Sequence, residues 1–381
     1  MKGSDEMEWR LGWYHSCDDY RALPFTFTEL TEVIQAVVNI SGRGVRLSLS
    51  NLYGKTKLVF QKVELSLDEK FHVKQTVTFN GMTQAEVEKG TAVMSDPVWL
   101  KIEAGVKLYV KISSRDKQIY SDFCCTYDTT VTNAAFVRNY EGIPHLQHSM
   151  NARRGWFCLN EINVLTDSKP KLINMTGDSL VEMGQISASV AETLYHAYPE
   201  KVVVVNTGAS GGRLLYDAPN DEQLYQTFGP SLIKRVFTES QKLRPALTIA
   251  LIGSNDLLLP LLSREAEGQI ITVVEFMQGI TQLKKILAQH NSDLLLGTIL
   301  PFSLGHGAVP HIKRYAQALE KRMEINHCLQ QLPEVLDCSH IVEDGKQQLK
   351  SAYDFGDHIH LNKQGGQKIA AAICAKINVE N

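Results

Sequence analysis

The chain has 381 residues, of which 44% are hydrophobic and 21% charged, which excludes a largely disordered chain and leaves room for two domains with separate cores. Its formal net charge is −3 and its lysines and arginines are scattered, which argues against a nucleic-acid partner. No apolar run reaches the length of a membrane span, so we expect no membrane partner.

Cysteine usage and the first residues bear on where the protein works. The chain has seven cysteines, and only Cys124 and Cys125 are closely spaced, so reduced thiols in a cytoplasmic protein are the simplest interpretation. The first residues, MKGSDEMEWRLGWYHSCDDY, lack the apolar stretch and small-residue cleavage site of a secretory signal. We therefore expect a cytoplasmic protein, although a secreted one whose signal has been removed would show the same pattern.

The first part of the chain, from about residue 24 to about 165, has the pattern of β-structure. Apolar and polar residues alternate in 45–50, 62–67 and 106–112, and short turn segments such as SGRG and FNGM separate such runs. Alternation of this kind is typical of antiparallel sheets with one solvated face. We predict an all-β sandwich domain over residues 1–165.

The pattern changes after a turn-rich boundary near residues 160–172. Apolar runs then alternate with helical patterns, which predicts a three-layer α/β domain around a parallel five-stranded sheet over residues 166–381. The expected strands are KLINMTG, KVVVVNTG, ALTIALIGSND, DLLLGTILPF and VLDCSHIV. The expected helices run to about Tyr198, then from about 221 to 242, 270 to 290, 313 to 331, and through NKQGGQKIAAAICAKI.

Polar residues gather where these predicted strands end. In an open parallel sheet, ligands bind beyond the carboxyl ends of the strands. The segments at that edge are Gly177-Asp178-Ser179, 206–211, 253–256 and 357–360. Together they supply a hydroxyl, amide donors, a carboxylate and an imidazole.

These residue types fit nucleophilic catalysis. A serine hydroxyl such as that of Ser179 needs an imidazole to accept its proton, and His360 is the candidate. Asp357, three residues earlier, can orient that ring. The oxyanion of the tetrahedral intermediate needs preorganised donors, for which the Ser179 amide, a glycine amide of the second loop and the Asn255 side chain are candidates.

Four short blocks resemble a known family. GDSL, NTGASG, GSND and DHIH, in this order, resemble the signature blocks of the SGNH (GDSL-type) hydrolase superfamily. The resemblance implies a flavodoxin-like catalytic domain with Ser179 as nucleophile, Gly211 and Asn255 as oxyanion donors, and Asp357 and His360 as the remaining catalytic pair. From the sequence alone, Gly208 stays open as an alternative donor to Gly211.

The resemblance extends to the first half and has departures. VRLSLSNLYGKTKL and SDPVWLKIEAGVKLYVKIS resemble the β-sandwich, jelly-roll-like, that precedes the catalytic domain in some two-domain bacterial GDSL esterases. The residues after the nucleophile, 181–184, lack the polar, acidic-glycine ending of related sequences, and Gly211 is followed by a second glycine, Gly212. Both departures bear on the substrate class.

Structural interpretations compete with some of these assignments. Ser179 could be only a helix N-cap, and Asn255 only a turn residue. Asp178 is better explained as an acceptor for loop amides, and His358, which alternates with His360, as a residue at the rim. The segment 306–311 could line the substrate pocket or form a surface loop.

The sequence predicts a serine carboxylic ester hydrolase that works through an acyl-enzyme on Ser179, without cofactor or metal. The resemblance implies short acyl groups, acetyl first, on a small-molecule or glycan substrate. An acyltransferase that uses the same residues stays open, as does a non-catalytic carbohydrate-binding protein with a vestigial hydrolase half. A lipase or lysophospholipase is disfavoured because no amphipathic lid is evident.

Overall fold

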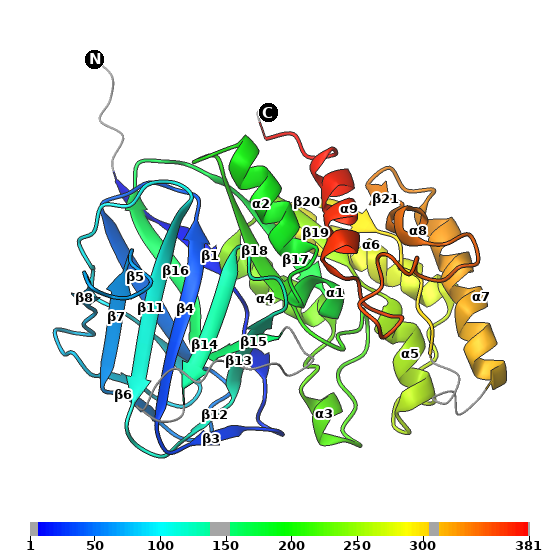
Figure 1. The fold of residues 1–381 in the computed structure, drawn as a ribbon. Helices are drawn as coiled ribbons and strands as arrows, with labels where there is room; N and C mark the ends of the chain where they lie inside the picture. Colours follow the sequence, from blue (N-terminus) through cyan, green and yellow to red (C-terminus); the bar gives the residue numbers. More distant parts are fainter. Residues whose placement is uncertain (1–6, 138–152, 305–311, 380–381) are drawn as a thin grey trace. The chain divides into compact units, whose positions relative to one another are not determined.

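A computed structural model describes residues 7–137, 153–304 and 312–379 (Figure 1). The chain divides into two compact units. The first unit comprises Met1–Lys171, Ala191–Val205 and Val379–Asn381, and the second comprises Leu172–Val190 and Asn206–Asn378. The predicted domains, 1–165 and 166–381, differ from these units chiefly because 191–205 falls in the first unit.

Every named element between residues 8 and 166 is a β-strand. The strands are β1 (Glu8–Tyr14), β2 (Asp18–Asp19), β3 (Phe25–Phe27), β4 (Leu30–Val38), β5 (Gly44–Asn51), β6 (Leu58–Phe60), β7 (Lys62–Ser66), β8 (Gln75–Thr76), β9 (Ala85–Val87), β10 (Thr91–Met94), β11 (Val106–Ser114), β12 (Gln118–Tyr120), β13 (Asp122–Thr126), β14 (Thr132–Val137), β15 (Arg154–Phe157) and β16 (Leu159–Thr166).

The two largest sheets of this unit are antiparallel. One has the order β1-β16-β5-β10, and the other has the order β14-β4-β11-β7-β8. In β11, Leu108, Val110 and Ile112 are buried while Lys107 is exposed, as expected for strands with one core-facing side. That the two sheets form a jelly-roll-like sandwich stays a prediction.

The predicted parallel five-stranded sheet is confirmed. Its strands are β17 (Lys171–Gly177), β18 (Val202–Gly208), β19 (Leu247–Leu251), β20 (Asp293–Gly297) and β21 (Val335–Leu336). The order is β18-β17-β19-β20-β21, which is the 2-1-3-4-5 order of flavodoxin-like folds. In such a sheet the order reverses between the first and third strands, here β17 and β19, and ligands bind beyond their carboxyl ends.

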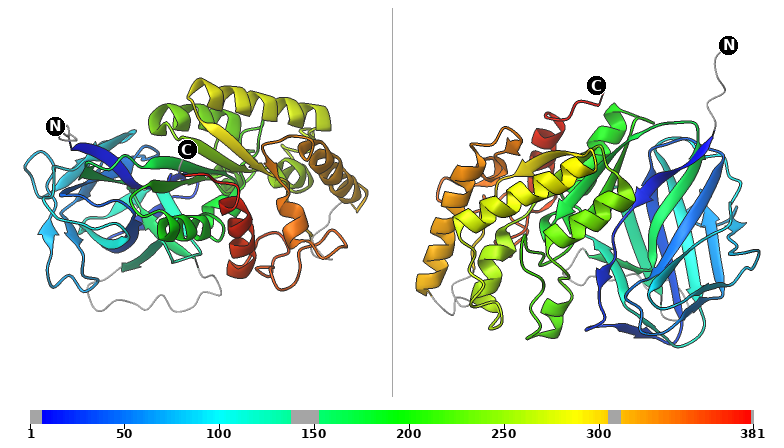
Figure 2. Two further views of the ribbon diagram at one scale, coloured as in Figure 1. Left: turned by 90° about the horizontal axis from the view of Figure 1, so that it is seen from above. Right: turned by 180° about the vertical axis from the view of Figure 1, so that it is seen from behind.

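Helices flank this sheet on both faces. They are α1 (Ser179–Glu182), α2 (Ser187–Ala197), α3 (Gln223–Gln226), α4 (Leu232–Leu243), α5 (Ser254–Leu262), α6 (Val273–Gln289), α7 (Ile312–Leu329), α8 (Cys338–Val342) and α9 (Lys363–Cys374). Figure 2 shows α4 and α6 on one face and α9 on the other. In α6, Phe276, Ile280, Leu283 and Leu287 recur at helical spacing and are buried in the core.

The predicted elements differ from the structure at four places. The last predicted strand, VLDCSHIV, ends at Leu336, and its residues Cys338–Val342 form α8. The helix expected up to Tyr198 is split into α1 and α2, with Gly184 at a positive φ of 91° between them. The helix expected over 221–242 is split into α3 and α4 by Gly229, which has a φ of 70°, and Pro230. The sequence analysis missed α5, because a helix buried almost all round has no amphipathic period.

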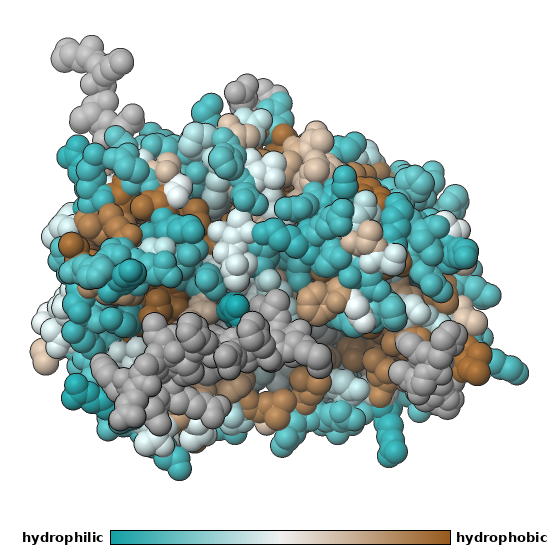
Figure 3. All heavy atoms as spheres, in the orientation of Figure 1, coloured by the Kyte–Doolittle hydropathy of each residue, from teal (hydrophilic) through white to brown (hydrophobic). Residues whose placement is uncertain are grey.

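Polar residues cover most of the surface in view in Figure 3, and hydrophobic residues form small separate groups on it. Within the described ranges, the helices are all too short or too polar to cross a bilayer.

Candidate active site

The turn after β17 presents Ser179 at the carboxyl edge of the sheet. Gly177 has a φ of 144°, and a Cβ there would lie 1.9 Å from the Leu251 carbonyl oxygen on β19, so only glycine fits. Asp178 is the N-cap of α1, and its Oδ1 accepts a hydrogen bond from Leu180 N–H at 3.0 Å. Capping is therefore the task of Asp178, and Ser179 is the first residue of the helix.

The structure brings Ser179, His360 and Asp357 into one chain of contacts. Ser179 Oγ lies 2.7 Å from His360 Nε2, and His360 Nδ1 lies 2.6 Å from Asp357 Oδ2. Asp357 Oδ1 also accepts hydrogen bonds from the backbone N–H of Ile359 at 3.0 Å and of His360 at 2.8 Å. With its proton on Nδ1, the imidazole has an unprotonated Nε2 facing the hydroxyl.

Two carboxyl groups near Ser179 have opposite pKa shifts. Burial by itself would raise the pKa of Asp357, but the hydrogen bond and charge of His360 and the backbone donors outweigh it and hold that pKa below its ordinary value. Asp178 is fully buried, and burial raises its pKa to about 7, against the opposing effect of the Leu180 N–H. Asp357 is therefore the carboxylate suited to stabilise an imidazolium, while Asp178 is suited to be neutral.

The two candidate glycines of the second loop differ in what their N–H groups do. Gly208 N–H donates to Asn206 Oδ1 at 2.9 Å, so it is already engaged. Gly211 has a φ of 72°, and a Cβ there would lie 2.1 Å from the Phe228 ring. In the part of the chain that the structure describes, no acceptor takes the Gly211 N–H. The geometry favours Gly211 as the donor available to a substrate.

Asn255 lies at the start of α5, beyond the end of β19. One N–H of its amide donates to the Gly212 carbonyl at 3.2 Å, which links the third loop to the second and leaves the other N–H for a ligand. The next residue, Asp256, accepts Leu214 N–H with both oxygens at 3.0 Å, and burial raises its pKa to about 6. Asn255 and Asp256 thus tie the start of α5 to the chain just after the second loop.

Two further side chains, for which the sequence predicts no role, shape this site. Asn206 donates to the Val181 carbonyl and to Ser187 Oγ, both at 3.0 Å, in addition to its bond with Gly208. Arg235, on α4, donates to the carbonyls of both strand ends that carry the loops. The NTGASG block contained a signal for Asn206, but Arg235 lies in a helix with no motif around it.

His358 lies at the rim as predicted, but strand alternation is not the reason. His358 does not alternate with His360 along a strand; it lies in a turn with a φ of 63°, and its Nδ1 lies 2.5 Å from Asp354 Oδ2. Its side chain is 58% exposed, in agreement with a place at the rim. The other candidate lining segment, 306–311, lies outside the described residues. Within the described chain, no three His, Cys, Asp or Glu side chains are grouped so as to hold a metal ion.

No family model and no curated protein matches the chain. Solved structures do match it, among them one described as a GDSL-like lipase from Bacteroides thetaiotaomicron VPI-5482, with 15% identity, a TM-score of 0.38, and coverage of 53% of this chain and 85% of the other. A variant of an acetyl xylan esterase from Geobacillus stearothermophilus matches with 16% identity, a TM-score of 0.39, and coverage of 55% and 96%.

A third match is an α/β hydrolase enzyme from the metagenome of Lake Arreo, Spain, with 19% identity, a TM-score of 0.37, and coverage of 55% and 95%. Over about half of its length, the chain is similar to solved structures that include a GDSL-like lipase and an acetyl xylan esterase.

Proposed function

We propose that the chain is a serine esterase of the SGNH (GDSL-type) superfamily that hydrolyses carboxylic esters through an acyl-enzyme on Ser179. The observation that carries this proposal is the 2.7 Å separation of Ser179 Oγ and His360 Nε2, with Asp357 on the other nitrogen of the same ring. A base within hydrogen-bonding distance of the nucleophile, itself oriented by a carboxylate, is what serine acyl transfer requires.

The first half of the reaction transfers the acyl group to the enzyme. Ser179 Oγ attacks the ester carbonyl while His360 Nε2 takes the hydroxyl proton, and Asp357 stabilises the resulting imidazolium. The oxyanion is held by the N–H groups of Ser179 and Gly211 and by the Asn255 amide, each worth about 3 kcal/mol of barrier. The bond to the alcohol oxygen then breaks, and His360 returns its proton to the leaving alcohol.

The second half uses water in place of the alcohol. His360 takes a proton from a water molecule, whose oxygen attacks the acyl carbonyl through a second oxyanion intermediate. The bond to Ser179 Oγ breaks, Oγ regains its proton from His360, and the carboxylic acid leaves. No group beyond these side chains and water is needed to balance the atoms.

The substrate class is inferred from the family resemblance. GDSL-type sites are shallow and open, which suits short acyl groups, acetyl first, on a larger alcohol such as a carbohydrate. We also infer that the strands of the first unit form a jelly-roll-like sandwich of the kind found before such catalytic domains.

The test is acid release from aryl esters of increasing acyl length and from acetylated xylo-oligosaccharides. The Ser179→Ala variant should lose about 10⁴-fold or more of the wild-type rate, while Ser351→Ala, which changes an exposed serine of the last loop, should keep it. Trapping with an activated acetyl ester should add one acetyl group to the wild type alone. Equal rates for wild type and Ser179→Ala would refute the proposal, and ester formation with an added alcohol in preference to acid release would make the chain an acyltransferase.

A further inference from the structure

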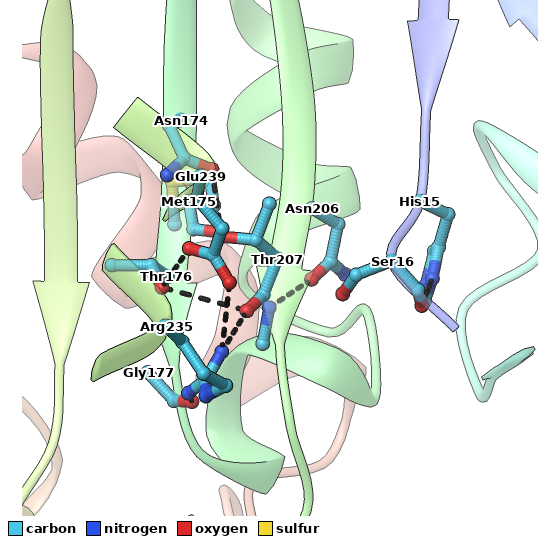
Figure 4. Close-up of polar contacts among 11 residues, drawn as sticks. His15, Ser16, Asn174, Met175, Thr176, Gly177, Asn206, Thr207, Arg235 and Glu239 are labelled. Atoms are coloured by element: carbon cyan, nitrogen blue, oxygen red, sulfur yellow. Dashed lines mark hydrogen bonds and ion pairs between the residues drawn. The ribbon is translucent and has the colours of Figure 1, made fainter. Parts of the chain in front are cut away.

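A buried guanidinium lies behind the loops that carry Ser179 and Gly211. Arg235 Nη2 donates to the Gly177 carbonyl at 2.8 Å, and its Nη1 donates to the Thr207 carbonyl at 2.7 Å. Figure 4 shows the Arg235 side chain beside Gly177 and Thr207, and Arg235 itself lies on α4. The mechanism above makes no use of this side chain.

The two carbonyls belong to the ends of the strands that position the reacting groups. Gly177 stands two residues before Ser179, and Thr207 stands four residues before Gly211. The Gly177 carbonyl also accepts Ala209 N–H at 3.1 Å, so the two strand ends contact each other where Arg235 holds them. One guanidinium therefore joins the turn that carries Ser179 to the loop that carries Gly211.

The guanidinium also lies close to the residue that follows the candidate oxyanion donor. A Cβ on Gly212 would lie 3.5 Å from Arg235 Nη2 and 3.5 Å from the Gly177 carbonyl oxygen. Both are ordinary contact distances, and the close approach of such a Cβ, at 2.9 Å, is to the Ala209 carbonyl oxygen.

The charge of Arg235 is balanced within its own helix. Glu239, one turn later, places Oε1 3.1 Å from Arg235 Nη1, and its Oε2 lies 3.4 Å from Thr176 Oγ1 (Figure 4). The two side chains are only 11% and 13% exposed. A buried ion pair is no more stabilising than two well-packed apolar side chains, so stability alone gives little reason for it.

We propose that Arg235 is a positioning residue, which sets the distance from Ser179 Oγ to the Gly211 N–H by holding the Gly177 and Thr207 carbonyls with one guanidinium. This inference rests on the proposed esterase function. Lysine does not replace arginine here, because one ammonium lacks the rigid pair of donors that reaches two carbonyls. Donor placement matters most when the oxyanion forms, so the effect falls on kcat rather than on KM.

The experiment measures kcat and KM for Arg235→Ala and Arg235→Lys with a short-chain aryl ester. We expect kcat to fall roughly 10- to 100-fold in both variants, with KM within about twofold of wild type. The matched control is Arg322→Ala, because Arg322 is also buried. Its guanidinium donates to Ser339 Oγ and to the Gln347 carbonyl, which follow β21, the edge strand at the opposite end of the sheet from β18. That variant should keep the wild-type kcat.

Chemical rescue separates positioning from general stability. Guanidinium chloride, added to Arg235→Ala far below denaturing concentrations, should restore part of kcat by filling the vacated space with the same fork of donors, whereas methylammonium chloride at equal ionic strength should not. Arg235→Lys, which keeps the charge and most of the volume, provides the measurement if the alanine variant does not fold.

Three results would overturn the positioning role: folded Arg235 variants with wild-type kcat, an equal loss of kcat in Arg322→Ala, or equal rescue by guanidinium and methylammonium. Ser179→Ala in the same assay keeps the two proposals apart. An active Ser179→Ala refutes the esterase function and this inference with it, whereas an inactive one beside unaffected Arg235 variants refutes the positioning role alone.

Discussion

Two aspartate–histidine pairs lie in the loop before α9, and their local geometry is almost the same. His358 Nδ1 lies 2.5 Å from Asp354 Oδ2, and His360 Nδ1 lies 2.6 Å from Asp357 Oδ2. In each pair the other carboxylate oxygen accepts hydrogen bonds from two backbone N–H groups. Only one of the pairs, Asp357 and His360, reaches Ser179.

The difference lies in the second ring nitrogen. The His360 side chain is 21% exposed and its Nε2 faces Ser179 Oγ. The His358 side chain is 58% exposed, and among the described residues no second side chain makes a hydrogen bond or an ion pair with it. An aspartate that orients a histidine is thus a product of local turn geometry. The pair that we propose to be catalytic differs from the other in its contact with the Ser179 hydroxyl, which another part of the chain supplies.

Replacing each of the two histidines in turn tests this comparison. We expect His360→Gln to lower kcat/KM by about 10⁴-fold or more, because glutamine cannot accept the Ser179 proton. His358→Gln should leave kcat/KM within about threefold of wild type, as is usual for an exposed residue. Ester hydrolysis by the two purified variants checks this, and comparable losses in both would mean that both rings take part.

The matching aspartates give a smaller effect. Asp357→Asn should lower kcat by about 10²- to 10⁴-fold, because the amide favours the wrong tautomer of His360 and does not stabilise the imidazolium. Asp354→Asn should leave kcat within about threefold, since Asp354 orients only the exposed His358. Steady-state rates for both variants test the pair, and an unaffected Asp357→Asn would remove Asp357 from the mechanism.

The pH dependence of activity tests the role given to Asp357. Because the pKa of Asp357 is held below its ordinary value, its carboxylate stays ionised over the range from about pH 5 to pH 8. Asp357 should therefore orient the His360 ring over this whole range, and Asp357→Asn should lower kcat by about the same factor at about pH 5 and at about pH 8. A loss of kcat that disappeared at the acid end of this range would mean that the Asp357 carboxylate is protonated there.

Much of the fold and site could be predicted because strand ends of a parallel sheet meet at one edge. This rule places Ser179 and Asn255 at one edge of the sheet, after β17 and β19. His360 follows α8 rather than a strand, so its place beside Ser179 follows from the family resemblance and not from this rule. The choice between Gly208 and Gly211 could not be made, because it depends on whether the Asn206 side chain occupies an N–H group.

Arg235 could not be found at all from the sequence. With Glu239 it forms an i, i+4 pair of the kind that stabilises exposed helix surfaces, and only the fold shows that α4 turns it toward the strand ends. The break between α3 and α4, in contrast, could have been predicted, because Gly229-Pro230 is a dipeptide that interrupts helices.

A third aspartate, Asp178, is buried and contrasts with the ionised Asp357. Its Oδ1 accepts Leu180 N–H, but its Oδ2 is buried and has no partner within the described chain, and burial raises its pKa to about 7. Between an ordinary value near 3.9 and about 7, the folded state binds more protons than the unfolded state. The stability that Asp178 contributes is therefore present at acid pH and is lost as pH rises through this window.

Asp178→Asn should remove that loss, because asparagine does not ionise and its Oδ1 can still cap α1. In urea unfolding, the free energy of unfolding should change less between about pH 5 and pH 8 in this variant than in wild type. The two changes should differ by on the order of 2 kcal/mol. Asp357→Asn is the matched control, since the Asp357 carboxylate is ionised at both pH values and its loss shifts both free energies equally. If Asp178→Asn kept the wild-type pH dependence, Asp178 would be charged at both values, and the contrast between the neutral acid beside Ser179 and the ionised acid beside His360 would be wrong.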